Sequence, residues 1–146
     1  MTKLGMSRED RALSFSMTLP TISDECAATI LVVEDEFLIR FMVSDELRDS
    51  GLCVVEASNA DEALEIVHSG LTVDLIFSDV RMPGSMDGLE LLAHLQDLSS
   101  AIPVIITSGH LLPNEALQRG AIKFLVKPYT GADAADLIKS VLATSL

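Results

Sequence analysis

The sequence TILVVEDE, residues 29–36, decides how the rest of the chain is interpreted. Its first part, Thr29–Glu34, is an apolar run rich in β-branched side chains, which is typical of a strand buried on both faces of a parallel sheet. The residues from Glu36 to Ser50 then show helical spacing. One stripe of this predicted helix carries Ile39, Met42, Val43 and Leu47. A buried strand followed directly by an amphipathic helix predicts a βα unit.

The same alternation continues outward from this unit to the end of the chain. Further strands are predicted at Leu52–Ala57, Val73–Ser78, Pro103–Thr107 and Ile122–Val126. Further helices are predicted from Asn59 to Ser69, at Asp87–Leu98, from Pro113 to before Gly120, and at Gly131–Thr144. Five such units predict an α/β fold, a doubly wound five-stranded parallel sheet with five helices, of which the fourth is short.

Composition and charge limit the kind of protein this is. The chain has 146 residues, 49% of them hydrophobic, which suits one compact domain with a real core. The net charge of −12 disfavours nucleic acid and anionic membrane surfaces as partners. No apolar stretch is long enough to cross a bilayer and no signal peptide is recognisable, so a cytoplasmic location is expected. Cys26 and Cys53 are interpreted as reduced thiols.

The two parts of the chain differ in character. Residues 1–28 are rich in Ser, Thr and Met and lack regular apolar spacing, which predicts an extension that is flexible or loosely docked. Residues 29–146 are predicted to form the domain. After Leu146 the sequence offers no output domain, so an output through protein contacts or phosphate flux is expected.

Polar side chains gather where the predicted strands end. Glu34 and Asp35 follow the first strand, Asp79 the third, Ser108 the fourth and Lys127 the fifth. Because carboxyl ends of parallel strands meet at one edge of the sheet, these groups should converge there. Three neighbouring carboxylates repel one another unless a cation neutralises them, and an all-oxygen ligand set suits Mg²⁺. With a lysine and a hydroxyl alongside, the groups fit phosphoryl transfer.

Four motifs carry a resemblance to a known family. They are VVEDE (Val32–Glu36), SDVRMPGSMDG (Ser78–Gly88), PVIITSG (Pro103–Gly109) and FLVKPY (Phe124–Tyr129). In this order the sequence resembles the receiver domain of two-component response regulators, the CheY-like family with a flavodoxin-like fold. The resemblance covers residues 29–144 and implies a stand-alone response regulator that is not an enzyme acting on other substrates.

The resemblance also implies a role for each motif residue. Asp79 is expected to be the phosphoacceptor, and Lys127 to contact the phosphoryl oxygens. Mg²⁺ would be bound by Asp35, by Glu34 largely through water, by Asp79, and by the backbone carbonyl of Arg81. The peptide bond from Lys127 to Pro128 is usually cis in the family.

Ser108 is expected to be the switch hydroxyl and Phe124 the switch aromatic. A turn role for Ser108 and a static core role for Phe124 stay open. Two departures from the family pattern bear on this switch: an extra residue, Gly84 or Ser85, in the loop after Asp79, and a shortened fourth helix.

The expected partners are a histidine kinase or a histidine phosphotransfer protein, and a downstream protein target. On the first helix, Phe37, Leu38 and Phe41 fall opposite the inward stripe and are predicted to dock the phosphodonor. Two other occupants remain open: residues 1–28, or a second copy in a homodimer. The competing function is a phosphorylation-independent interaction module that keeps the fold without the chemistry.

Overall fold

The computed structural model describes residues 26–98, 101–110 and 113–144. Its sheet consists of β2 (Thr29–Val33), β3 (Cys53–Ala57), β4 (Leu75–Asp79), β5 (Val104–Ser108) and β6 (Lys123–Val126). The strands are parallel and lie in the order β3-β2-β4-β5-β6. The predicted doubly wound five-stranded sheet is therefore confirmed.

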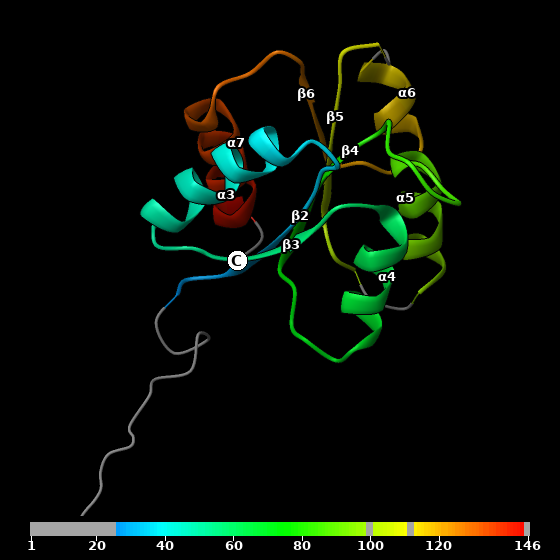
Figure 1. The fold of residues 1–146 in the computed structure, drawn as a ribbon, viewed down its shortest axis with the longest axis horizontal. Helices are drawn as coiled ribbons and strands as arrows, with labels where there is room; N and C mark the ends of the chain where they lie inside the picture. The colour runs from blue at the N-terminus through cyan, green and yellow to red at the C-terminus, as the bar shows by residue number, and fades with distance from the viewer. Residues whose placement is uncertain (1–25, 99–100, 111–112, 145–146) are drawn as a thin grey trace, which may run out of the picture.

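Helices cover both faces of this sheet. They are α3 (Phe37–Asp49), α4 (Ala60–His68), α5 (Gly88–Asp97), α6 (Pro113–Gln118) and α7 (Gly131–Thr144). Figure 1 shows α3 and α7 on one face and α4, α5 and α6 on the other. Each face has its own apolar core, built around residues such as Leu47 and Ile138 on the first and Leu91 and Ile106 on the second.

The strand order places the functional edge of the sheet. The chain winds from β2 outward to β3 and then returns to β4 on the other side of β2, so the winding reverses between β2 and β4. Ligand sites of open α/β sheets lie at the carboxyl ends of the strands beside such a reversal. The strands β4 and β5 are fully buried, as their apolar sequences predicted. They bring Asp79 and Ser108 to this edge as their last residues.

Local signals also set the helix ends. Asn59 accepts a hydrogen bond from the backbone N–H of Glu62 at 2.8 Å and caps α4, as predicted. Gly51 follows α3 with a φ of +89°, the left-handed conformation that a glycine after a helix adopts readily. The fourth helix, α6, has six residues, which confirms that it is short. Ile39 differs from its prediction, because it is half-buried at a pocket rather than part of the core.

The interpretation of both cysteines as reduced thiols is wrong. Cys26 and Cys53 form a disulfide, with Cα atoms 5.5 Å apart. The cause is the pairing of the first two strands, because the N–H of Cys53 donates to the carbonyl of Ala28 at 2.9 Å and Thr29 is in register with Cys53. This pairing brings two cysteines 27 residues apart in sequence to adjacent positions. Disulfides are uncommon in reducing compartments, so the two cysteines give no support to the expected cytoplasmic location.

Within the described ranges, no helix combines the length and apolar character that crossing a bilayer requires. The predicted extension, residues 1–28, lies outside the described residues up to residue 25, including the segment considered as a cover for the first helix.

Candidate functional site

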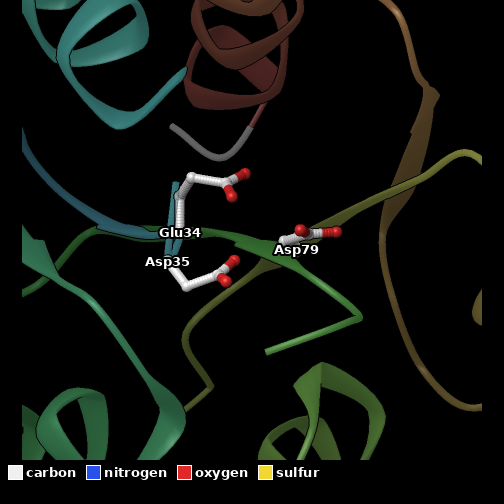
Figure 2. A group of neighbouring side chains, drawn as sticks. All are labelled: Glu34, Asp35 and Asp79. Atoms are coloured by element: carbon white, nitrogen blue, oxygen red, sulfur yellow. The ribbon is translucent and has the colours of Figure 1, made fainter. Parts of the chain in front are cut away.

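Three carboxylates meet where β2 and β4 end. Glu34 and Asp35 directly follow β2, and Asp79 is the last residue of β4, its neighbour in the sheet. One oxygen from each side chain lies within 4.8 Å of the others. Figure 2 shows Glu34 and Asp35 on either side of the strand end, with both carboxylates directed toward the side where Asp79 lies. Glu34 and Asp79 are buried and Asp35 is exposed.

Lys127 connects two of these carboxylates. Its ammonium Nζ donates to Asp79 Oδ2 at 2.8 Å and to Glu34 Oε1 at 3.3 Å. Burial acts to lower the pKa of Lys127, but the hydrogen bonds and charges of Asp79 and Glu34 outweigh it and raise that pKa. The side chain leaves the backbone just after β6, immediately before a cis peptide bond to Pro128, as the resemblance implied. Lys127 therefore stays charged and holds the acidic groups together.

Every polar group of Glu34 has a partner. Its N–H donates to the carbonyl of Ala57 at 3.0 Å, and Oε2 accepts from the N–H of Glu36 at 3.1 Å. Its own carbonyl accepts from the Arg40 guanidinium at 2.8 Å, and Oε1 accepts from Lys127. Burial and the charge of Asp79 nevertheless raise the pKa of Glu34 to about 7. The carboxylate is therefore fixed in place, and its ionisation is less favourable than that of a glutamate in water.

Asp79 is held by the backbone that follows it. Its Oδ1 accepts from the N–H of Val80 at 2.8 Å, while Oδ2 receives Lys127. The first residue of α5, Gly88, packs so closely that a Cβ there would overlap the carbonyl oxygen of Asp79. Only glycine allows this approach. The sequence motif Ser78–Gly88 contains this glycine, but the sequence did not reveal why a glycine is needed there. The reason is a contact between the end of β4 and the next helix.

Asp35 and Asp79 line a pocket of about 680 Å³. One part of its wall is charged or polar and the other part is apolar. The polar part includes Asp35, Asp79, Arg81, Ser108, His110 and Lys127. The apolar part includes Ile39, Met42, Pro128 and Tyr129. Asp79 therefore lies at a pocket whose wall includes α3, the ends of β4 and β5, and the segment that joins β6 to α7.

The predicted switch residues occupy different places. Ser108 is buried at the pocket wall, and its Oγ accepts from the N–H of His110 at 3.1 Å. Phe124 is half-buried, lies in register with Ile106 and packs on the core under α4, α5 and α6 rather than at the pocket. Tyr129, which the sequence analysis did not select, lines the pocket and makes an edge-to-face contact with Phe77 at 5.8 Å.

The predicted partner surface is exposed. Phe37, Leu38 and Phe41 have 62%, 77% and 54% of their surface accessible. The two phenylalanine rings stack with centroids 6.2 Å apart. Ile39 and Met42 of the same helix line the pocket, so α3 carries both this apolar surface and a part of the pocket wall.

The acidic group fits a hard divalent cation. Mg²⁺ prefers oxygen ligands and is usually bound by one or two carboxylates with several waters. Glu34, Asp35 and Asp79 supply oxygens only, and the exposure of Asp35 leaves room for waters. Burial, and after it the charge of Asp79, raise the pKa of Glu34, so a nearby cation would favour its ionised form. Of the site residues predicted from the sequence, the structure thus brings together Glu34, Asp35, Asp79, Arg81, Ser108 and Lys127.

Comparison with known proteins agrees with this geometry. The model of the family described as "Response regulator receiver domain" matches residues 30–141. The DNA-binding transcriptional regulator NtrC of Escherichia coli is 35% identical over 117 residues, covering 78% of this chain and 24% of NtrC. The two-component response regulator ORR11 of Oryza sativa is 29% identical over 147 residues, covering 97% of this chain and 99% of ORR11.

Solved structures give the same result. The receiver domain of NtrX from Brucella abortus superimposes with a TM-score of 0.72 at 34% identity, covering 79% of this chain and 98% of that one. The chain spans about a quarter of the length of NtrC, so what NtrC does as a whole is a property of that longer protein.

Proposed function

We propose that this chain, which belongs to the response regulator receiver domain family, accepts a phosphoryl group on Asp79 in the presence of Mg²⁺. The observation that supports this most directly is the contact of Lys127 with Asp79 at 2.8 Å, beside a group of three carboxylates that lie within 4.8 Å. A cationic side chain beside a nucleophilic carboxylate at the mouth of an open pocket suits transfer of an anionic group.

The transfer is a displacement at phosphorus. A carboxylate oxygen of Asp79 forms a bond to phosphorus while the P–N bond of the donor phosphohistidine breaks, and the electron pair of that bond stays on the imidazole nitrogen. The N–H of Val80 orients the Asp79 carboxylate, and Lys127 is placed to neutralise phosphoryl oxygens. Glu34, Asp35, Asp79 and the carbonyl of Arg81 would hold Mg²⁺, which when bound offsets the negative charge of the transferred group.

Ser108 and Phe124 are the proposed response elements. The Ser108 hydroxyl lies at the pocket wall, where it could donate to a phosphoryl oxygen on Asp79. Phe124 lies on the neighbouring strand, and the short α6 precedes that strand. We infer that a new hydrogen bond at Ser108 is transmitted through β5 and β6 to the face of the sheet that α6 covers. The output is a protein contact or phosphate flux, and the net charge of −12 disfavours nucleic acid as the direct target.

Receiver domains act with histidine kinases or histidine phosphotransfer proteins, and we infer that such a donor docks on Phe37, Leu38 and Phe41. All three side chains are exposed, the two phenylalanine rings stack, and other residues of the same helix line the pocket beside Asp79. A partner seated there brings its phosphohistidine to the pocket mouth.

The first experiment tests the acceptor. The purified chain is incubated with acetyl phosphate and Mg²⁺, and the phosphorylated fraction is measured by intact-protein mass spectrometry. The Asp79→Asn variant should take up no phosphoryl group, because the nucleophilic carboxylate is lost. Asp97→Asn, at an exposed aspartate at the end of α5, is the matched control and should be labelled as fully as the unmodified chain. Labelling of Asp79→Asn at the unmodified level would refute the assignment, and an unlabelled wild type would favour the phosphorylation-independent module.

The second experiment tests the docking surface. Phe41→Ser should slow transfer from a phosphorylated kinase or phosphotransfer protein and leave labelling by acetyl phosphate unchanged, because only the protein donor needs the surface. Leu71→Ser, at an exposed leucine between α4 and β4 that does not line the pocket, is the control and should change neither reaction. Equal impairment of both reactions would show that Phe41 serves the fold. If Phe41→Ser changed neither reaction, Phe41 would not be part of the docking site. If the molar mass measured by light scattering rose with concentration for the wild type and not for Phe41→Ser, the surface would instead belong to a homodimer.

A further inference from the structure

The short turn at residues 34–36 carries two of the three carboxylates and joins β2 to α3. Glu36, the residue before the first turn of α3, makes no side-chain capping bond. Within the turn, the N–H of Glu36 donates to Glu34 Oε2, and the other bonds that hold the turn come from neighbouring elements. One of them comes from Arg40, in the second turn of the same helix, whose guanidinium donates to the carbonyl of Glu34 at 2.8 Å.

Arg40 makes three contacts: one with the acidic turn, one with β3 and one with a residue of its own helix. Besides the carbonyl of Glu34, its Nε donates to Glu56 Oε1 on β3 at 3.1 Å. Its guanidinium carbon also lies 5.6 Å from the ring centroid of Phe37. The side chain is only 16% exposed, so these contacts are partly shielded from water, where charge-assisted bonds are stronger.

Glu56 gives Arg40 a fixed anchor on the edge strand. Its second oxygen, Oε2, pairs with Arg48 at 3.1 Å, so the carboxylate is held from two sides. Val32 of β2 and Glu56 of β3 are in register, which places the anchor beside the strand that leads into the acidic turn. Arg40 thus spans from β3 to the end of β2. Lysine offers one nitrogen and cannot make both bonds at the angle that a planar guanidinium provides.

We propose that Arg40 is a positioning residue of the acidic site: by tying the Glu34 carbonyl to Glu56, it fixes the turn that presents Glu34 and Asp35 to a divalent cation. This inference rests on the proposed function, because it assigns Arg40 to the cation site of the phosphoacceptor. Arg40 has no contact with Asp79 among the described hydrogen bonds and ion pairs and acts through the backbone of Glu34. The contact with Phe37 places the same guanidinium beside the proposed docking surface.

The test compares Arg40→Lys with Arg48→Lys in the full chain. Arg48 is a matched control, because it pairs with the same Glu56 and donates to the carbonyl of Val54 at 3.3 Å, yet makes no described contact with the acidic turn. Mg²⁺ binding is followed by the fluorescence of Tyr129, which lines the pocket and is the single tyrosine of a chain without tryptophan. Amide hydrogen exchange of residues 34–37 is measured without Mg²⁺, and urea unfolding reports global stability.

Arg40→Lys should raise the Mg²⁺ dissociation constant about ten-fold, the size of effect seen when a group that orients a metal ligand is replaced. It should also speed exchange at residues 34–37, and Arg48→Lys should do neither. A merely structural salt bridge would lower stability in both variants and leave the turn and the Mg²⁺ affinity unchanged, which would overturn the proposal. If the wild type itself binds no Mg²⁺, the proposed cofactor is wrong, and the exchange rates alone then decide whether Arg40 fixes the turn.

Discussion

The buried charge of Glu34 should make the stability of the protein fall as pH rises. Its carboxyl has an ordinary pKa of 4.5, which burial and the charge of Asp79 raise to about 7 in the folded protein. Between these values the folded state holds a proton that the unfolded state has lost. Stability is therefore greatest below the unfolded pKa and is lost as pH rises through the folded pKa. Replacing Glu34 with glutamine should remove this loss.

The size of the effect follows from the two pKa values. The interval from 4.5 to about 7, at about 1.4 kcal/mol for each pH unit, corresponds to about 3 kcal/mol. Water in the pocket beside Asp35 screens part of this repulsion, so we expect about 2 kcal/mol in solution. Glu34→Gln keeps one side-chain oxygen, which can accept from the N–H of Glu36, while its neutral amide carries no charge that titrates. The pH dependence therefore isolates the charge.

The assay is urea unfolding of the wild type and Glu34→Gln at a series of pH values from about 5 to 8 in a chelator, to keep the site free of cations. As pH rises, the free energy of unfolding of Glu34→Gln should increase relative to that of the wild type. Glu65→Gln, at an exposed glutamate of α4, is the control and should track the wild type. Mg²⁺ should stabilise the wild type most at high pH. A wild-type and Glu34→Gln difference that stays constant across the series would refute the reasoning.

Three further predictions concern the surroundings of the site. Gly88→Ala should destabilise the protein by about 3 kcal/mol or more in urea unfolding, because the added Cβ would meet the carbonyl of Asp79. A well-folded variant with unchanged stability would contradict this packing. Replacing Arg81 or His110, which line the pocket, should change the rate of dephosphorylation several-fold, about 1 kcal/mol in the barrier, without preventing phosphorylation, as followed by mass spectrometry over time. Dithiothreitol should lower stability by about 3 kcal/mol, because reduction opens a loop of 27 residues, and Cys53→Ser should not respond to it.

The fold and the location of the site could be predicted because both depend on signals that are local in sequence. The strands β4 and β5 are buried along their whole length and so appear as apolar runs, and glycines and capping residues mark the helix ends. The topology then requires the strand ends to meet. Asp79, Glu34 and Lys127 could therefore be placed together without any contact being known, and the structure brings them within hydrogen-bonding distance.

The features that the sequence did not reveal depend on side-by-side placement of residues far apart in the chain. The Cys26–Cys53 disulfide follows from the register of β2 with β3, which an isolated strand prediction does not contain. Arg40 was not selected from the sequence, because its contact with Glu56 on β3 exists only once α3 packs beside that strand. Ile39 shared the inward stripe of its helix, yet it lies in the first turn of α3, close after the end of β2, and lines the pocket.

Charge balance connects the acidic turn, Lys127 and the proposed cation. When all three carboxylates are ionised, Lys127 offsets one of the three negative charges, and the charge that remains is the one a divalent cation neutralises. Arg40 contributes little to this balance, because it is paired with Glu56. Without a cation the group can reduce its charge by binding a proton at Glu34, whose pKa of about 7 makes this possible near neutral pH. A proton and a cation therefore compete for the same negative charge. Ionisation of Glu34 lowers the free energy of unfolding, and binding of the cation raises it again.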